Sequence, residues 1–304
     1  MFKKINYLTL ILASLYLLSA CTGSAKKGSS SDELTFNDSL ANNAPLELSE
    51  EVMSDVIQNI SSPVEMASLI KSTGVDFSQK ILNSSEQIDA YNTSYKRALN
   101  LGVYSADLGY INIYDKNTIV VSYLVAIKSL AEGIKVGQFF DFNSLKRLAT
   151  NSNNLDSLMQ ISISSFNKMD SYLRNQKRSN VSSLIVTGAW VEGLYISSKV
   201  IEQTNDEDLI NRIAEQKDII NILEIILNNY DADPDFAELA GRIGKLKEAY
   251  KDIKITTEFT EPKTIEKDGK LIIVQDEVSH IEITPEQLAG IIAEIYSLRD
   301  YIVS

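Results

Sequence analysis

Residues 100–110 read Asn-Leu-Gly-Val-Tyr-Ser-Ala-Asp-Leu-Gly-Tyr and place Gly102, Ala106 and Gly109 at positions i, i+4 and i+7. On a helix, this spacing leaves one face almost without side chains. A glycine in a helix interior costs about 1 kcal/mol relative to alanine. Two glycines on one face therefore predict that another backbone approaches this helix closely.

A second stretch repeats the pattern. Residues 188–195 read Gly-Ala-Trp-Val-Glu-Gly-Leu-Tyr, and small residues recur at Ala189, Gly193 and Ser197. We expect this stretch to lie on a helix over residues 181–203, with a second nearly bare face.

Both helices also carry an acid that is followed three residues later by tyrosine. The pairs are Asp107–Tyr110 and Glu192–Tyr195, and an isoleucine follows each tyrosine. The offset between the two pairs is constant at 85 residues. The match raises the hypothesis that two helical hairpins arose by duplication.

Two interpretations of these acids remain open. In the first, the small residues pack the core and the acids lie at its rim. In the second, Asp107 and Glu192 face each other in a cleft that binds a cation or a small polar ligand. A partly buried carboxylate pair is costly unless it is paired or coordinated, so it would mark a functional site. The aromatic side chains expected to line this cleft are Tyr104, Tyr110, Trp190 and Tyr195.

Residues 100–110 and 188–195 resemble segments of a group of secreted, helical bacterial lipoproteins without assigned function. The resemblance extends over roughly residues 50–304. It implies an all-helical body and supplies no activity.

Apolar residues at helical spacing dominate the chain from Ser49 onward. Two capping boxes with proline at the first helical position, Ser62–Glu65 and Thr284–Gln287, mark helix starts. Short loops join the helices, so we expect a mainly α fold, an antiparallel bundle of about eight to nine helices. The expected helices are 49–60, 62–74, 86–114, 117–131, 142–149, one capped by Asn154, 181–203, 207–227 capped by Asn205 or Asp206, 233–251, and 284–302.

The pattern changes to alternation after Asp252. Residues 255–259 alternate like a strand, and Asp268-Gly269 separates two short runs in the manner of a hairpin turn. We therefore expect a small β-hairpin at about residues 255–283, before the last helix. With that excursion, residues 49–304 form one domain.

The N-terminus carries a charged pair, Lys3-Lys4, a short apolar run over 5–17, and the sequence Leu18-Ser19-Ala20-Cys21. This ending resembles the bacterial lipobox. The resemblance implies that residues 1–20 are a signal peptide and that Cys21 receives lipid; the alternative is an ordinary secretory peptide. Thr22 after the cysteine favours the outer membrane by the same resemblance. Residues 21–48 are rich in small polar residues and are expected to form a flexible linker.

Composition excludes several function classes. His280 is the only histidine and Cys21 the only cysteine, which argues against a structural zinc site and excludes a di-iron site of the ferritin type. No G-x-S-x-G motif accompanies the histidine, which we expect on a strand surface. The formal net charge of −12 argues against nucleic acid as a partner.

We expect a non-enzymatic, lipid-anchored module that binds a protein or another envelope component, without metal or cofactor. The first alternative is a small-ligand or cation binder that uses the cleft near Asp107 and Glu192. An enzyme would have to rely on carboxylates, tyrosines or serines alone.

Lipidation can be tested by Cys21→Ser. The substitution removes the thiol that accepts the lipid, and without its acyl chains the protein loses the anchor. We expect labelled fatty acid and membrane association to be lost together, measured by metabolic labelling and fractionation. Ser29→Ala, in the linker, is the control and should keep both. A wild-type chain without label would contradict the assignment.

Overall fold

The computed structural model describes residues 63–149, 155–259, 263–267, 270–274 and 277–304. The chain divides into units 1–44 and 45–304, and every described residue belongs to the second unit. The signal peptide, Cys21, the linker and the helix expected at 49–60 lie outside the described residues, as do Asn154 and the turn residues Asp268-Gly269.

The described residues form ten α-helices and four strands, so the mainly α fold with a β-hairpin before the last helix is confirmed. The helices are α2 (Pro63–Ser72), α3 (Ser94–Ile113), α4 (Asn117–Gly133), α5 (Phe142–Ala149), α6 (Leu155–Asn175), α7 (Ser179–Thr204), α8 (Glu207–Ala214), α9 (Lys217–Asn228), α10 (Pro234–Ala249) and α11 (Pro285–Val303). Three 3₁₀ turns complete them: η1 (Gln79–Ile81), η2 (Ser85–Ala90) and η3 (Gly137–Phe139).

Local capping explains several helix ends. The Thr284 side chain accepts from the Gln287 amide and the Gln287 side chain accepts in return from the Thr284 amide, so the predicted capping box of α11 is confirmed. Asp233 caps α10 by accepting from the Asp235 amide. The cap of α8 is Asp206; Asn205 instead ends α7 in the left-handed conformation.

Two helix boundaries differ from the expectation. The helix expected from Glu86 begins only at Ser94, because Thr93 caps it and the buried Tyr91 interrupts the chain before it. The single helix expected over 207–227 is two helices, α8 and α9. The chain breaks where Gln216 turns inward and its side chain accepts a hydrogen bond from the buried Trp190 indole.

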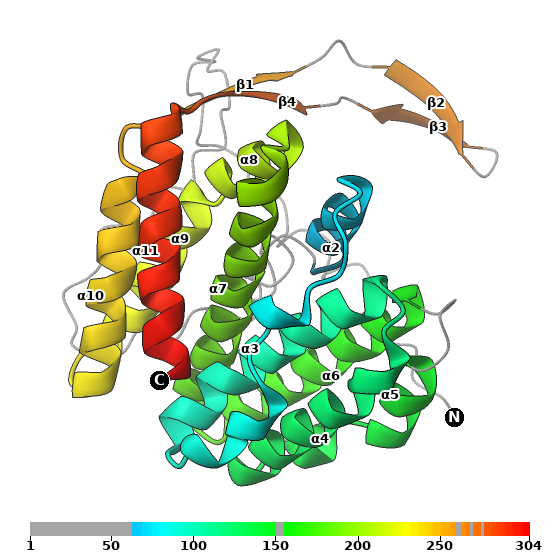
Figure 1. Cartoon of the computed structure of the whole chain (residues 1–304), viewed down its shortest axis with the longest axis vertical. Coiled ribbons are helices and arrows are strands. Elements are labelled where there is room, and N and C mark those ends of the chain that lie inside the picture. The colour runs from blue at the N-terminus through cyan, green and yellow to red at the C-terminus, as the bar shows by residue number, and fades with distance from the viewer. Residues whose placement is uncertain (1–62, 150–154, 260–262, 268–269, 275–276) are drawn as a thin grey trace, which may run out of the picture. The chain divides into compact units, whose positions relative to one another are not determined.

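The strands are β1 (Lys254–Phe259), β2 (Lys263–Lys267), β3 (Lys270–Val274) and β4 (Glu277–Glu282). They form two antiparallel two-stranded sheets, β1 with β4 and β2 with β3 (Figure 1). Lys267 pairs with Lys270, so two residues join β2 to β3, as the Asp-Gly signal predicts. Strands β2 and β3, the inner pair, lie between β1 and β4, the outer pair, in the sequence. His280 is exposed on β4, as expected.

Helix α7 lies at the centre of the bundle and packs against α2, α3, α6, α8, α9 and α11. Figure 1 shows it beside α11, which in turn lies beside α10. Among the described residues, α7 is the helix long and apolar enough to cross a membrane, yet 78% of its most apolar window is buried in the fold. We interpret it as a core helix.

The closest helix contact joins α3 to α7 at two glycines. A Cβ on Gly102 would lie 2.1 Å from the carbonyl oxygen of Ile185, and a Cβ on Gly188 would lie 2.0 Å from that of Leu99. The backbone approach predicted at Gly102 is therefore present. Gly109 and Gly193, which we expected to share it, have no neighbouring atom within 4 Å of an added Cβ. That part of the prediction is wrong, and Gly188 takes their place.

These glycines supply a matched test. Gly102→Ala or Gly188→Ala forces a methyl group into backbone, and we expect a loss near the upper end of the 1–3 kcal/mol typical of overpacking. Gly109→Ala and Gly193→Ala should instead stabilise the protein by up to about 1 kcal/mol, since they lie in helices with open space. Urea unfolding of all four variants measures this. Equal effects in the two sets would contradict the contact.

Candidate functional site

Helices α3 and α7 bring Asp107 and Glu192 together inside the core. Both side chains have no exposed area, and the charge of Glu192 acts on Asp107 and raises its pKa. The residues lie five and four positions beyond Gly102 and Gly188. The close glycine contact therefore places the two acids on facing turns. Two buried carboxyl groups on facing turns are costly unless they are paired or one of them carries a proton.

Arg299, from α11, is the cation of this cluster. Its Nε lies 3.0 Å from Oε2 of Glu192 and its Nη2 lies 3.2 Å from Oε1, so the pair is bidentate. The guanidinium carbon lies 4.5 Å from the centre of the Tyr195 ring. The arginine side chain is 11% exposed. The last helix of the chain thus supplies the counter-charge for an acid on the central helix.

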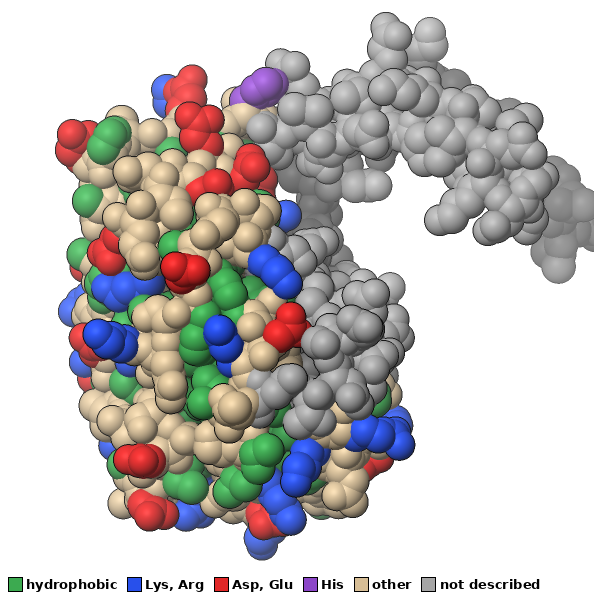
Figure 2. All heavy atoms as spheres, turned by 45° about the vertical axis from the view of Figure 1, so that its right-hand side comes forward, with side chains coloured by type: hydrophobic (Ala, Val, Ile, Leu, Met, Phe, Trp, Pro, Cys, Tyr) green, Lys and Arg blue, Asp and Glu red, His purple; other side chains and the backbone are tan. Residues whose placement is uncertain are grey.

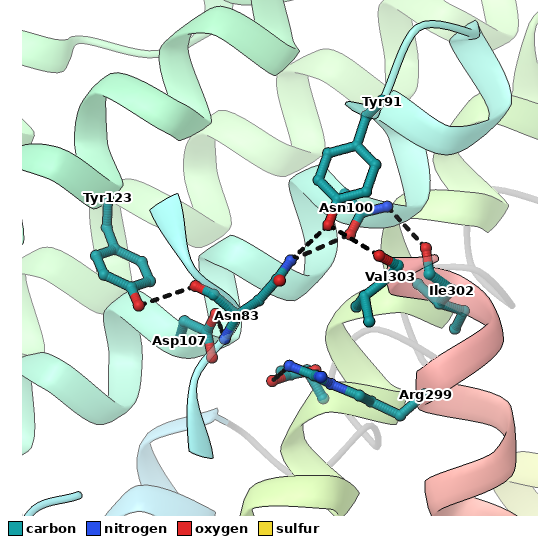
Figure 3. Close-up of polar contacts among 9 residues, drawn as sticks. Asn83, Tyr91, Asn100, Asp107, Tyr123, Arg299, Ile302 and Val303 are labelled. Atoms are coloured by element: carbon teal, nitrogen blue, oxygen red, sulfur yellow. Dashed lines mark hydrogen bonds and ion pairs between the residues drawn. The ribbon is translucent and has the colours of Figure 1, made fainter. Parts of the chain in front are cut away.

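Asn83 links Asp107 to the neighbouring helices (Figure 3). Its backbone N–H donates to Oδ2 of Asp107 at 3.2 Å, and its carbonyl accepts from the Tyr123 hydroxyl at 2.9 Å. Its side-chain amide donates to the Tyr91 hydroxyl at 2.9 Å and to Oδ1 of Asn100 at 3.4 Å. This asparagine is 3% exposed and lies between η1 and η2.

The same network holds the end of α11. Figure 3 shows Asn100 and Tyr91 directed at the last turn of that helix. The Asn100 amide donates to the carbonyl of Ile302 at 2.9 Å, and the Tyr91 hydroxyl donates to that of Val303 at 3.4 Å. Carbonyls at a helix C-terminus have no partner within the helix. Side chains from α3 and from the segment before it provide these partners.

Burial controls the electrostatics of the cluster. Burial and then the charge of Glu192 raise the pKa of Asp107 well above its ordinary value, against the smaller opposing effect of Arg299. Burial also raises the pKa of Glu192, although Arg299 opposes this. Oδ1 of Asp107 receives no N–H or O–H donor from the described residues. A neutral, protonated Asp107 fits both observations.

The aromatic residues expected around the acids divide into two groups. Tyr104 is fully buried near Asp107 and donates to the carbonyl of Ser84 at 2.6 Å. Tyr195 joins the cluster through Arg299. Tyr110 points elsewhere: its hydroxyl accepts from the Ser78 amide and its ring stacks on Phe77.

Trp190 also lies apart from the acids, because its indole N–H donates to Oε1 of Gln216 at 3.0 Å. The structure therefore brings Asp107, Glu192, Tyr104 and Tyr195 into one neighbourhood and leaves Trp190 and Tyr110 outside it. The acids do not line an open cleft, because neither has any exposed area. A cation from the chain itself pairs with Glu192.

Sequence reasoning missed Asn83 and Arg299. A signal for the arginine was present, because Arg299 lies one helical turn after the buried Ile295 and three residues before the buried Ile302. A charged residue in such a stripe predicts a buried partner. Asn83 lies in an irregular segment, where no periodicity exists to indicate burial.

The described residues contain no group of three or more His, Cys, Asp or Glu side chains that could hold a metal ion. Comparisons with protein-family models, with curated proteins and with solved structures found no match to this chain.

Two arginines allow the buried ion pair to be tested. Arg299 and Arg242 each pair with one glutamate and each lie over a tyrosine ring, but the Glu192 side chain is fully buried whereas the Glu238 side chain is 52% exposed. Arg299→Leu leaves Glu192 without its cation and should cost about 3–5 kcal/mol. Arg242→Leu should cost at most about 1 kcal/mol. Denaturant unfolding measures both, and equal losses would contradict the role of the buried pair.

Proposed function

We propose that this protein is a non-enzymatic binding module, held in the bacterial envelope by lipid on Cys21, which binds a partner protein. The observation that carries the proposal is that the Asp107–Glu192 cluster has no exposed area on either acid. Both acids, Asp107 and Glu192, are fully buried, and Arg299 of the same chain pairs with Glu192. Catalysis and ligand binding both require groups that a substrate can reach.

The expected alternative, a small-ligand or cation binder, depends on the same two acids. A ligand cation would have to displace Arg299 from a bidentate contact in the core. Breaking a buried ion pair costs about 3–5 kcal/mol before any new contact forms. We therefore place the binding surface outside the cluster.

The β2–β3 ribbon supports the proposal of a protein partner. Each sheet has two strands, so every described strand is paired on one side only. Unpaired strand edges present rows of N–H and C=O groups to which an extended segment of another chain can add. We propose that the partner contacts this ribbon. Figure 2 shows acidic and basic side chains interspersed on one described face, without a large field of one sign.

The register offers a clean way to remove the ribbon. Phe259 pairs with Glu277 at the end of the outer sheet. An Asn-Gly turn in place of residues 260–276 can therefore close β1 onto β4 as a two-residue hairpin. We expect this shortened chain to keep the thermal midpoint of the wild type within a few degrees, because the helical core is unchanged.

The binding test compares crosslinking in intact cells. A photo-reactive residue at position 264, in β2, should yield a discrete crosslinked complex, and one at the exposed position 248 of α10 should not. The shortened chain lacks position 264, so its binding is measured by native pull-down without crosslinking. We expect the partner to be lost from that pull-down. An undiminished complex in the shortened chain would contradict the ribbon as the contact, and the absence of any complex would contradict the proposed function.

A further inference from the structure

The acid cluster has two acids and one base. Asp107 and Glu192 are both fully buried, and Arg299 is the cation that pairs with Glu192. An arginine stays charged at every pH at which a protein is folded. With both acids ionised, the core would therefore hold one uncompensated negative charge, and a buried charge is costly unless it is paired.

None of the groups that face Asp107 can compensate its negative charge, so a proton on the acid remains as the means of neutralising it. From its own helix it faces the Tyr104 hydroxyl, from α4 that of Tyr123, from α7 Glu192, from α11 Arg299, and from the segment before η2 the amide of Asn83. Burial raises the pKa of both tyrosines, so they stay neutral. Among these groups Arg299 is the only cation, and Glu192 engages it with both oxygens.

We propose that Asp107 and Glu192 share one proton at neutral pH, and that this proton is part of a pH-sensitive latch by which Arg299 holds α11 against α3 and α7. The latch is a property of the fold and goes beyond the proposed binding function. The proton resides on Asp107, turns one of its oxygens into a donor to Glu192, and leaves Glu192 as the anion that binds the guanidinium.

The direction of the pH effect follows from linkage. Burial and the neighbouring Glu192 raise the pKa of Asp107 in the folded chain above its unfolded value of about 4. The folded chain then binds more protons than the unfolded chain at intermediate pH. This contribution to stability is complete below the unfolded pKa and is lost as pH rises toward the folded pKa. Over that window the unfolding constant rises by up to tenfold per pH unit.

The end of α11 is where the latch should act. Its last turn is held by Asn100 and Tyr91, and the carbonyl of Ser304 accepts from Lys96 at 2.9 Å. Loss of the proton leaves a second, uncompensated negative charge in the core, and opening of the last turns of α11, which lets water reach the acids, relieves the cost of burying that charge. The amides of residues 295–303 should therefore open before those of α10.

Infrared spectroscopy of the full chain tests the shared proton directly. A buried protonated carboxyl gives a carbonyl band distinct from that of a carboxylate. We expect this band at pH 7 in the wild-type protein, its loss on raising the pH, and its absence in Asp107→Asn. A wild-type spectrum without the band at pH 7 would overturn the proposal whether or not any variant folds.

Stability against pH tests the energetic consequence. Asp107→Asn keeps the shape of the side chain and a hydrogen-bond donor but removes the titrating carboxyl group. The ratio of the wild-type unfolding constant to that of the variant should therefore rise between pH 5 and pH 9. Asp170→Asn is the matched control, since Asp170 is also buried and pairs with Arg174 at 2.7 Å. That variant should unfold more readily than the wild type throughout. A ratio for Asp107→Asn that stays constant with pH would overturn the shared proton.

Hydrogen exchange tests the latch itself. After correction for intrinsic exchange rates, residues 295–303 of the wild type should lose protection as pH rises, relative to α10 in the same sample. In Asp107→Asn the protection of those residues should not depend on pH. An equal loss in both proteins would show that the proton does not hold α11 and would overturn that part of the proposal, leaving the proposed binding function unaffected.

Discussion

The contact between the backbones of α3 and α7 at Gly102 and Gly188 determines how the core is arranged. Each glycine faces a carbonyl of the other helix at a distance that excludes a methyl group. Beyond this contact the chain reaches Asp107 on one helix and Glu192 on the other, so the two helices advance in the same direction. Their parallel course places the two acids opposite each other.

The same contact brings two acids together in the core, and α11 supplies the cation that pairs with one of them. Two acids brought onto facing turns inside a core destabilise it unless they are neutralised. Arg299 neutralises one, and a proton on Asp107 neutralises the other. The burial of these acids therefore depends on docking of α11, the last element of the chain. The Arg299–Glu192 pair joins α11 to α7 directly, and removal of one partner of a buried pair destabilises a fold because the other charge stays buried.

Much of the fold was predictable because its signals are local. The capping box at Thr284, the caps at Asp206 and Asp233, and the bounds of the helix over 142–149 follow from neighbouring residues. The helix boundaries at Tyr91 and at Gln216 have tertiary causes. The Tyr91 side chain is buried in the core, and the Gln216 side chain accepts a hydrogen bond from the buried Trp190 indole. The convergence of Asp107 with Glu192 was predictable from small residues. Which glycines touch depends on how each helix is rotated, and the spacing alone does not determine that rotation.

A convergent pair of acids usually indicates a ligand site. The pair in this protein differs, because both acids are buried and Glu192 is already paired with Arg299. The decisive features are a counter-ion from the chain itself and the absence of exposed area on either acid. Such a cluster serves the fold, and its titration can affect function only through the stability of the helices it joins. We therefore place the proposed binding on the surface, where the two-stranded ribbon presents backbone N–H and C=O groups that have no partner within its sheet.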